Sequence, residues 1–478
     1  LKFSSTRPAP AHAGLASIGR MPRQRRCLLR LGACYEGIAI CAASARLEPA
    51  TVALGATRPA GMLGAGNELC CQSLADEDLE NLAATSLHGW IGRFPGGTPS
   101  NYFDWRTGNA TDCPFVAAGT AQRWARWTKA TGITDTIFVA NVLTDTLPQA
   151  VAALKAHRDQ GQRVRLVELG NELYDTTDPN NLAKYRRPRD YADAMQAWTS
   201  EIKREFPEAK VALIGERWNA VLPPDREQVW NKEVLQAPSS QQADAATIHV
   251  YAGPMPTVLP RPEDFPAFLQ GALAHIEGNR RNVDAQIPGH MRVWVTELGV
   301  TPPGGPTDGT WLQALYHATL TLGLFAIDRV DVVLPYCLVC QDPTGPSLAF
   351  SGGGWKITNK GLALSLAFDA LRGATEMTAL GANTSAAFVG WRTFTPAGEE
   401  RVILLNTGSA GLGLALGSPH LSLGAASYTQ LAPRSLEDML RPSARPERLD
   451  GTLGEVLQVP AYSITLLRGA VAASRMEV

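Results

Sequence analysis

Short apolar segments alternate with longer amphipathic ones between about residue 60 and residue 370. Apolar runs of about four to eight residues, bounded by polar turns, are typical of buried strands. The first run is rich in glycine and is also compatible with a loop. The runs predict eight strands, at residues 61–67, 89–94, 136–141, 164–169, 210–215, 245–250, 292–296 and 330–335.

The stretches between these runs have the spacing of helices. In residues 147–159, Leu147, Val151 and Leu154 recur at intervals of four and three residues, which places them on one helical face. Further helices are expected at 191–206 and 311–327. Strands that alternate with helices form a parallel sheet, and eight such strands close into a (β/α)8 barrel. The pattern therefore predicts an α/β fold of the TIM-barrel type.

Beyond about residue 370 the helical spacing fades, and short runs separated by Gly, Pro, Asn and Ser take its place. Strands are expected at 385–394, 401–406, 412–416, 427–431 and 463–467. This spacing is typical of an antiparallel β-sandwich, to which residues 49–55 are expected to add one strand. The predicted organisation is a leader at 1–48, a barrel at 58–369 and a C-terminal β-sandwich at 370–470.

The leader has two interpretations. Met21 is followed by a basic region, an apolar region at 27–42 and small residues that end at Ala45, which is the order found in secretory signal peptides. Arg30 and Glu36 interrupt the apolar region, so a disordered leader explains it equally well. The first interpretation predicts a secreted or endomembrane protein that is cleaved after Ala45. No segment is expected to span a membrane, because a transmembrane helix needs ~20 nearly uncharged residues.

Composition adds few constraints. Hydrophobic residues make up 45% of the chain and charged residues 19%, as in ordinary globular proteins. A formal net charge of −1 gives no reason to expect a nucleic-acid partner. Cys337 and Cys340 form a lone C-x-x-C motif, whereas a zinc site needs a second pair of Cys or His ligands. Buried thiols in a strand are therefore expected, and no metal site.

Two glutamates end predicted strands on opposite sides of the barrel. Glu172 follows the fourth strand and Glu297 the seventh, and chemistry in such barrels takes place at the carboxyl ends of the strands. Glycoside cleavage needs two carboxyl groups: one protonates the leaving oxygen, and the other attacks the anomeric carbon or activates water. The two glutamates therefore predict a glycosidase. Retention and inversion differ in the separation of the carboxyl groups, about 5–5.5 Å against about 6.5–9.5 Å.

Two other carboxylates compete for these roles. Glu168 lies four residues before Glu172 and points to the same side of the strand but deeper in the barrel, so we interpret it as a buried, paired structural residue. Glu216 ends the fifth strand beside Arg217 and is interpreted as an ion-paired group.

The two glutamate motifs resemble those of a known clan. Residues 168–172 and 294–297 look like the acid/base and nucleophile motifs of glycoside hydrolase clan A, whose members are retaining (β/α)8 enzymes. Residues 93–98 followed by 101–105 resemble the second-strand motif of heparanase and β-glucuronidase-like proteins of family 79, and also that of α-L-arabinofuranosidase-like sequences. Residues 460–467 resemble the strand that closes the accompanying β-sandwich.

The resemblance implies roles for residues near the glutamates. Asn171 would hydrogen-bond the sugar 2-hydroxyl, with a turn-forming asparagine as the alternative. Arg93 and Asn101 would touch substrate, although structural roles fit them equally well. His249 and Tyr251 end the sixth strand in a His-x-Tyr pattern that is common in the clan, and Tyr251 would hydrogen-bond the nucleophile. A packed strand-end histidine is the alternative for His249.

Two more residues are candidates for substrate binding. Asn141 ends the third strand and either lines the cavity or caps a loop. Trp355 follows three glycines after the eighth strand and is either an aromatic platform for a sugar or part of the core.

The sequence thus predicts a retaining glycoside hydrolase of a polysaccharide or glycoconjugate, similar to β-glucuronidase and heparanase. An α-L-arabinofuranosidase of the same clan is the alternative, and a catalytically inactive carbohydrate-binding barrel is the alternative of another class. No cofactor is expected, because the mechanism uses only carboxylates and water.

Overall fold

A computed structural model describes most of the chain beyond the leader. The described residues are 52–65, 76–87, 90–111, 119–219, 225–301, 305–339, 345–382, 388–415, 426–454 and 456–470. The predicted leader, with Met21 and the cleavage site after Ala45, lies outside them. None of the helices described has both the length and the apolar character that crossing a bilayer requires.

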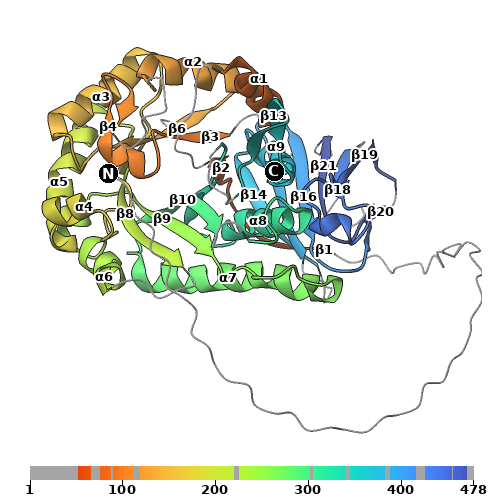
Figure 1. Cartoon of the computed structure of the whole chain (residues 1–478). Helices are drawn as coiled ribbons and strands as arrows, with labels where there is room; N and C mark the ends of the chain where they lie inside the picture. Colours follow the sequence, from red (N-terminus) through yellow and green to blue (C-terminus); the bar gives the residue numbers. More distant parts are fainter. Residues whose placement is uncertain are drawn as a thin grey trace, which may run out of the picture. The chain divides into compact units, whose positions relative to one another are not determined.

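Eight parallel strands close into a barrel, as the sequence predicts (Figure 1). Each strand hydrogen-bonds its neighbours in chain order, and the last pairs with the first. The glycine-rich first run is a strand and not a loop. The strands are β2 (Met62–Ala65), β3 (Ile91–Phe94), β6 (Asp135–Ala140), β7 (Leu166–Leu169), β8 (Lys210–Asn219), β9 (Ala245–Ala252), β10 (Arg292–Val300) and β11 (Val330–Pro335).

Helices surround the barrel (Figure 1). Those described are α1 (Glu77–Ser86), α2 (Ala121–Thr131), α3 (Leu147–Asp159), α4 (Pro179–Lys184), α5 (Pro188–Glu205), α6 (Asp225–Val234), α7 (Phe265–Gln286), α8 (Trp311–Leu324) and α9 (Asn359–Leu371). In α5 the buried Tyr191, Met195, Trp198 and Ile202 recur every three or four residues, so one face packs against the barrel. The Tyr191 hydroxyl donates a hydrogen bond to the carbonyl of Leu169, which ties this helix to the end of β7.

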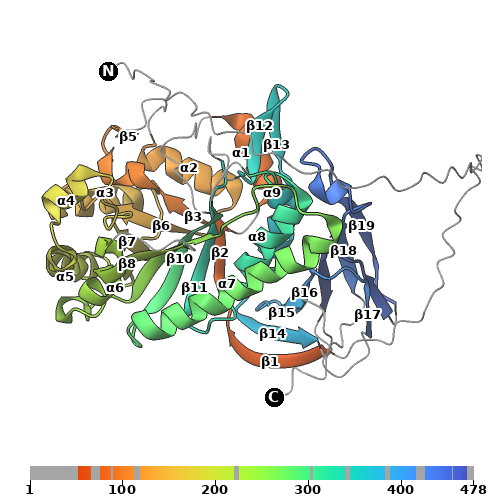
Figure 2. The ribbon, with the colours of Figure 1, turned by 60° about the horizontal axis from the view of Figure 1, so that its bottom comes forward.

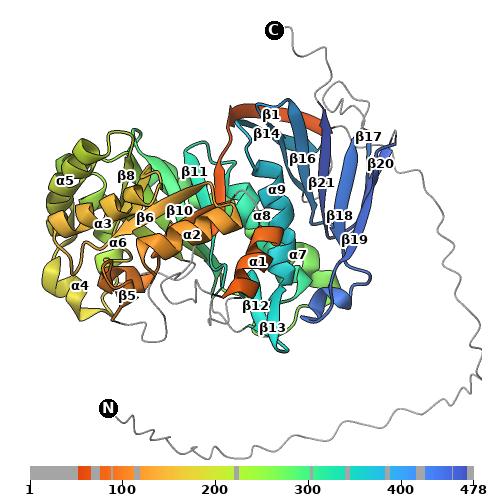
Figure 3. The ribbon, with the colours of Figure 1, turned by 90° about the horizontal axis from the view of Figure 1, so that it is seen from above.

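The helix α8 is buried along its whole length. A helix that is apolar on all sides needs packing partners on all sides, and α8 contacts α7, α9 and β11 as well as strands of the C-terminal sheet. Figure 3 shows α8 and α9 between the barrel and that sheet. The indole of Trp391 donates to the carbonyl of Leu322 in α8, and the indole of Trp311 donates to the carbonyl of Tyr462. These bonds join the two domains through buried backbone groups.

The C-terminal domain is an antiparallel β-sandwich, as predicted. A seven-stranded sheet has the order β1 (Val52–Pro59), β14 (Glu376–Ala382), β15 (Phe388–Phe394), β16 (Glu399–Asn406), β21 (Ser463–Ala470), β18 (Ser427–Ala432) and β19 (Glu447–Thr452). A second, two-stranded sheet pairs β17 (Leu412–Ala415) with β20 (Val456–Val459). Side chains of both sheets share one apolar core, which includes Val402, Leu404, Leu414 and Leu457.

Residues before the barrel join the sandwich as strand β1. It pairs with β14 from Val52 opposite Ala382 to Pro59 opposite Glu376, and Figure 2 shows the two strands side by side. The barrel is therefore inserted between the first two neighbouring strands of this sheet.

Cys337 follows β11 and is buried. It is disulfide-bonded, and because it is the only cysteine among the described residues, its partner lies outside them. The expectation of free thiols within a strand was therefore wrong for Cys337.

Candidate active site

A tight turn after β7 carries Glu172. The strand ends at Leu169, and Gly170 has φ 97°. A Cβ at Gly170 would lie 2.8 Å from Cγ2 of Val142, so only glycine fits there. Glu172 itself has φ 44°, a conformation that costs a non-glycine residue ~1–3 kcal/mol and that clusters at functional sites. Glu172 thus lies in a strained turn beyond the strand that was predicted to end with it.

Glu297 lies within β10 and not at its end. The strand continues to Val300, and Glu297 is in register with His249 of β9. Its carboxylate is buried and accepts two hydrogen bonds, from Nη1 of Arg93 at 2.8 Å and from the hydroxyl of Tyr251 at 2.5 Å. Both oxygens are therefore held by a donor.

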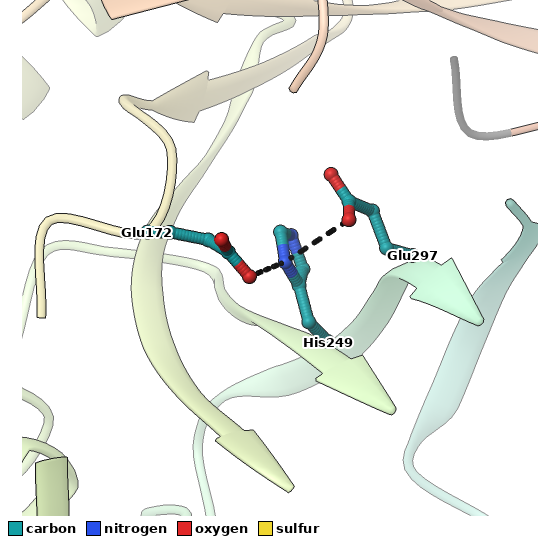
Figure 4. Close-up of side chains that lie close together, drawn as sticks. All are labelled: Glu172, His249 and Glu297. Atoms are coloured by element: carbon teal, nitrogen blue, oxygen red, sulfur yellow. Dashed lines mark hydrogen bonds and ion pairs between the residues drawn. The ribbon is translucent and has the colours of Figure 1, made fainter. Parts of the chain in front are cut away.

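His249 lies between the two glutamates (Figure 4). Its Nδ1 is 2.8 Å from Oε1 of Glu172 and 3.5 Å from Oε2 of Glu297. One nitrogen of His249 and one oxygen of each glutamate all lie within 4.8 Å of one another. The fold therefore brings together side chains of β9, β10 and the turn after β7, which are separated in the sequence.

The charges of this cluster are coupled. Burial raises the pKa of Glu172, but the hydrogen bond and the charge of His249, with help from Arg217 and Tyr174, outweigh burial and lower the pKa to about 2. Burial lowers the pKa of His249, but the charge of Glu297 and the hydrogen bond to Glu172 outweigh it and raise the pKa. These shifts favour a charged Glu172 beside a protonated His249 in the unliganded site.

Arg93 has structural partners, which agrees with the second of the two roles considered for it. Its side chain is wholly buried, and it donates from Nε to Glu168, from Nη1 to Glu297 and from Nη2 to Asn171, over 2.6–2.8 Å. Glu168 is buried and paired, in agreement with the structural role predicted for it, and also accepts from the hydroxyl of Thr296. Arg93 therefore connects the second, fourth and seventh barrel strands beneath the site.

Asn101 and Asn171 hold each other. The side-chain amide of Asn101 donates to the carbonyl of Asn171 at 2.8 Å, and its oxygen accepts from the backbone N–H of Asn171 at 3.1 Å. Asn101 is buried in the short 3-10 helix η2 (Thr98–Tyr102), so its side chain fixes the turn before Glu172. This contact fits the structural role that was the alternative to a substrate contact for Asn101.

Asn141 and Trp355 are not part of the cluster around Glu172. The oxygen of Asn141 accepts from the backbone N–H groups of Leu143 and Thr144, so this residue caps a loop, which was the alternative interpretation. The indole of Trp355 donates to Asp76 at the start of α1, and its ring meets the ring of Phe350 edge-on in the hairpin of β12 (Leu348–Ser351) and β13 (Gly354–Ile357).

Sequence reasoning missed two residues that touch Glu172. The hydroxyl of Tyr174 donates to Oε1 of Glu172 at 2.9 Å, and Nη1 of Arg217 is 4.0 Å from the same oxygen. Burial and the charge of Glu172 raise the pKa of Tyr174 well above its ordinary value, so it remains a donor. A systematic reading of polar residues at the end of the fifth strand could have found Arg217, whereas Tyr174 gives no pattern signal.

Glu172, His249 and Glu297 could together offer three atoms to a metal ion. Both oxygens of Glu297 and Nδ1 of His249 already take part in hydrogen bonds. The guanidinium of Arg93 at 2.8 Å from Glu297 would repel a divalent cation. The donor set therefore suits proton transfer between side chains better than metal binding.

Neither a protein-family model nor a curated protein matches the sequence. Solved structures do align with most of the chain. An α-L-arabinofuranosidase from Thermotoga maritima is 14% identical and has a TM-score of 0.61, over 89% of this chain and 99% of its own. A family 51 α-L-arabinofuranosidase from Bifidobacterium longum is 15% identical with a TM-score of 0.64, over 88% and 99%. A 4-O-α-L-rhamnosyl-β-D-glucuronidase from Fusarium oxysporum is 12% identical with a TM-score of 0.58, over 88% and 100%.

The arabinofuranosidases are clan A glycoside hydrolases, in which a TIM barrel carries a C-terminal β-sandwich. This chain shares their fold, a barrel with a C-terminal β-sandwich. The resemblance to clan A that its sequence suggested is thus confirmed for the fold. At these identities the likeness shows the fold alone, so the activity has to be argued from the site.

Proposed function

We propose that this protein is a retaining glycoside hydrolase in which Glu172 is the acid/base and Glu297 the nucleophile. The observation that carries the proposal is the close approach of the two carboxylates, since one oxygen of each lies within 4.8 Å of the other, with His249 between them. Retaining glycosidases hold their carboxyl groups about 5–5.5 Å apart, whereas inverting ones leave about 6.5–9.5 Å for a water molecule. The short separation supports double displacement.

Glu297 is suited to attack the anomeric carbon. Arg93 and Tyr251 each donate to one of its oxygens, and these bonds orient the carboxylate before substrate arrives. A nucleophile that is already oriented loses little entropy on the way to the transition state. The attack forms a glycosyl ester at Glu297 and breaks the bond to the leaving oxygen, which takes a proton from Glu172.

Glu172 receives that proton from His249. We assign the proton of the unliganded site to His249, because its pKa is raised and its Nδ1 lies 2.8 Å from Oε1 of Glu172. Transfer along this bond gives the neutral acid that protonates the leaving oxygen. Once the leaving group has departed, ionised Glu172 accepts a proton from water as the water attacks the ester. His249 thus serves as a proton store beside the acid/base.

We assign the contact with the sugar to Asn171. Its side-chain oxygen accepts from Nη2 of Arg93, which fixes the amide and directs its amino group as the donor. A hydrogen bond from this group to the sugar 2-hydroxyl would strengthen in the transition state.

Two sugars are candidates for the site. The family 79 resemblance and the glucuronidase among the structural neighbours favour a β-glucuronide. The α-L-arabinofuranosidases among the neighbours favour an α-L-arabinofuranoside as the alternative.

We also propose that the protein is secreted, since its signal-like leader and the disulfide at Cys337 fit an oxidising compartment.

The test is a panel of 4-nitrophenyl glycosides that includes β-D-glucuronide, α-L-arabinofuranoside and β-D-xyloside. Glu297→Ala should lose turnover of the best substrate, and added azide should restore it with a glycosyl azide of inverted configuration. Glu172→Ala should be slower by about 10²–10⁴-fold. Glu263→Ala, which alters a carboxylate exposed by 60% in the 3-10 helix η4 (Pro262–Asp264), is the matched control and should behave as wild type.

Two outcomes would contradict this assignment. Wild-type activity in Glu297→Ala would show that another group is the nucleophile. A wild-type protein that binds oligosaccharides but cleaves none of the panel would be the catalytically inactive carbohydrate-binding barrel.

A further inference from the structure

Arg217 lies on the side of the site that belongs to the acid/base. It is near the end of β8, where it is in register with His249 of β9. Its Nη1 is 4.0 Å from Oε1 of Glu172, and its guanidinium lies 6.0 Å from the centre of the Tyr174 ring. Because Tyr174 donates to Glu172, all three residues form one wall of the site.

This wall faces the leaving group if the proposed roles of the two glutamates hold. The acid/base must reach the glycosidic oxygen, whereas the nucleophile approaches the opposite face of the sugar. Groups that lie near Glu172 but not near Glu297 therefore contact the leaving group. Arg217 is such a group.

The two arginines of the site differ in what they can reach. Arg93 is fully buried, and each nitrogen of its guanidinium already donates to Glu168, Glu297 or Asn171. The side chain of Arg217 is 28% exposed. Arg217 therefore brings a positive charge to the surface of the site.

We propose that Arg217 is a specificity-determining residue that favours a leaving group with a carboxylate, such as an acidic sugar residue. This inference rests on the proposed function. A guanidinium matches a carboxylate with two parallel N–H donors, and the Tyr174 ring supports the guanidinium from one side. The acidic group binds on the leaving side, whichever sugar is attached at Glu297.

The test compares two leaving groups on the sugar that the wild type cleaves best. One glycoside carries 3-carboxy-4-nitrophenol, and the other carries the methyl ester of the same phenol, which is neutral. The ratio of kcat/KM for the acid to that for the ester measures the preference for charge. Because both substrates are measured on the same preparation, the fraction of folded protein cancels from this ratio.

Arg217→Gln should lower the ratio by about tenfold, the lower end expected for a hydrogen bond to a charged group, since this arginine is partly exposed. Arg217→Lys keeps the charge but loses the paired donors and should give an intermediate ratio. The control is Arg163→Gln, which changes an arginine that is 65% exposed just before β7, at the opposite end of the barrel. It should leave the ratio as in wild type.

An unchanged ratio in Arg217→Gln would overturn the inference, even if both rates fell together, because an equal fall means that Arg217 acts only through Glu172. Failure of the proposed function looks different. In that case the wild type would cleave neither of these glycosides nor any member of the nitrophenyl panel.

Discussion

Replacing Arg93 by methionine tests whether the buried network beneath the site is both a structural and a catalytic element. The substitution keeps much of the side-chain volume but removes the only cation that contacts Glu168 among the described residues. Arg93 and Glu168 are 0% and 1% exposed, so water cannot replace the lost partner. Removing one member of such a buried pair costs ~3–5 kcal/mol, and we expect Arg93→Met to lose this much free energy of unfolding.

The double variant Arg93→Met with Glu168→Gln separates charge from packing. Glu168→Gln removes the buried charge that Arg93→Met leaves without a partner. The hydroxyl of Thr296, 3.1 Å from Glu168, can still hydrogen-bond to the neutral amide. We expect the double variant to regain at least ~2 kcal/mol relative to Arg93→Met, because a buried charged group without a partner costs more than a neutral one. Activity should stay low in both, since Glu297 and Asn171 have lost a donor.

Urea denaturation followed by fluorescence of the 11 tryptophans measures these differences. Arg189→Met is the matched control, because Arg189 and Asp193 form an ion pair whose members are 42% and 56% exposed. It should change the free energy of unfolding by less than ~1 kcal/mol. The reasoning is refuted if Arg93→Met unfolds at the same urea concentration as wild type, or if the double variant is less stable than the single one.

Three further predictions concern other buried groups. Burial lowers the pKa of His157 from 6.5 to about 4. Below pH 6.5 the unfolded chain therefore binds a proton at this residue that the folded chain excludes. The free energy of unfolding falls as the pH drops. At ~1.36 kcal/mol per pKa unit, the loss by pH 4 is about 3 kcal/mol. His157→Phe should therefore flatten the dependence of the urea midpoint on pH. An unaltered slope would contradict this. Asn101→Ala leaves the backbone of Asn171 without two partners, so kcat/KM should fall by about a hundredfold in steady-state assays; wild-type kinetics would exclude this positioning role. Trp391→Phe removes a hydrogen bond to the buried carbonyl of Leu322. It should lower the free energy of unfolding by ~1–3 kcal/mol with little change in kcat. A urea midpoint equal to that of wild type would mean that the bond does not stabilise the domain contact.

The sequence predicted the barrel because each of its strands is a short apolar run with a polar boundary. The strands that it missed include β14 and β19, and the reasons for these two differ. The strand β14 follows α9 after a short turn, and its residues do not alternate clearly between apolar and polar. The strand β19 lies at the edge of its sheet, and five of its six residues are exposed. Charged residues protect such edges from pairing with other chains, and they also erase the apolar signal of a strand.

The candidate site was predicted in part. Glu172 and Glu297 could be found because the ends of barrel strands share one face. The places of Arg93 and Asn101 could not, because an arginine or asparagine near a strand end can face either substrate or a buried carboxylate. Only the fold decides that Arg93 reaches Glu168 and Glu297 at once. Charge pairs across a barrel depend on strands that are distant in the sequence.

The pairing of β1 with β14 also sets an order of events during synthesis. At ~5–20 residues per second, synthesis of the barrel takes on the order of tens of seconds. This time separates the emergence of β1 from that of β14. Throughout this interval β1 lacks its native neighbour β14. A ribosome-bound chain that ends at residue 370 should therefore be open to protease within residues 52–59, and protection there would contradict this order. Completion of the sheet must wait until the whole barrel has left the ribosome.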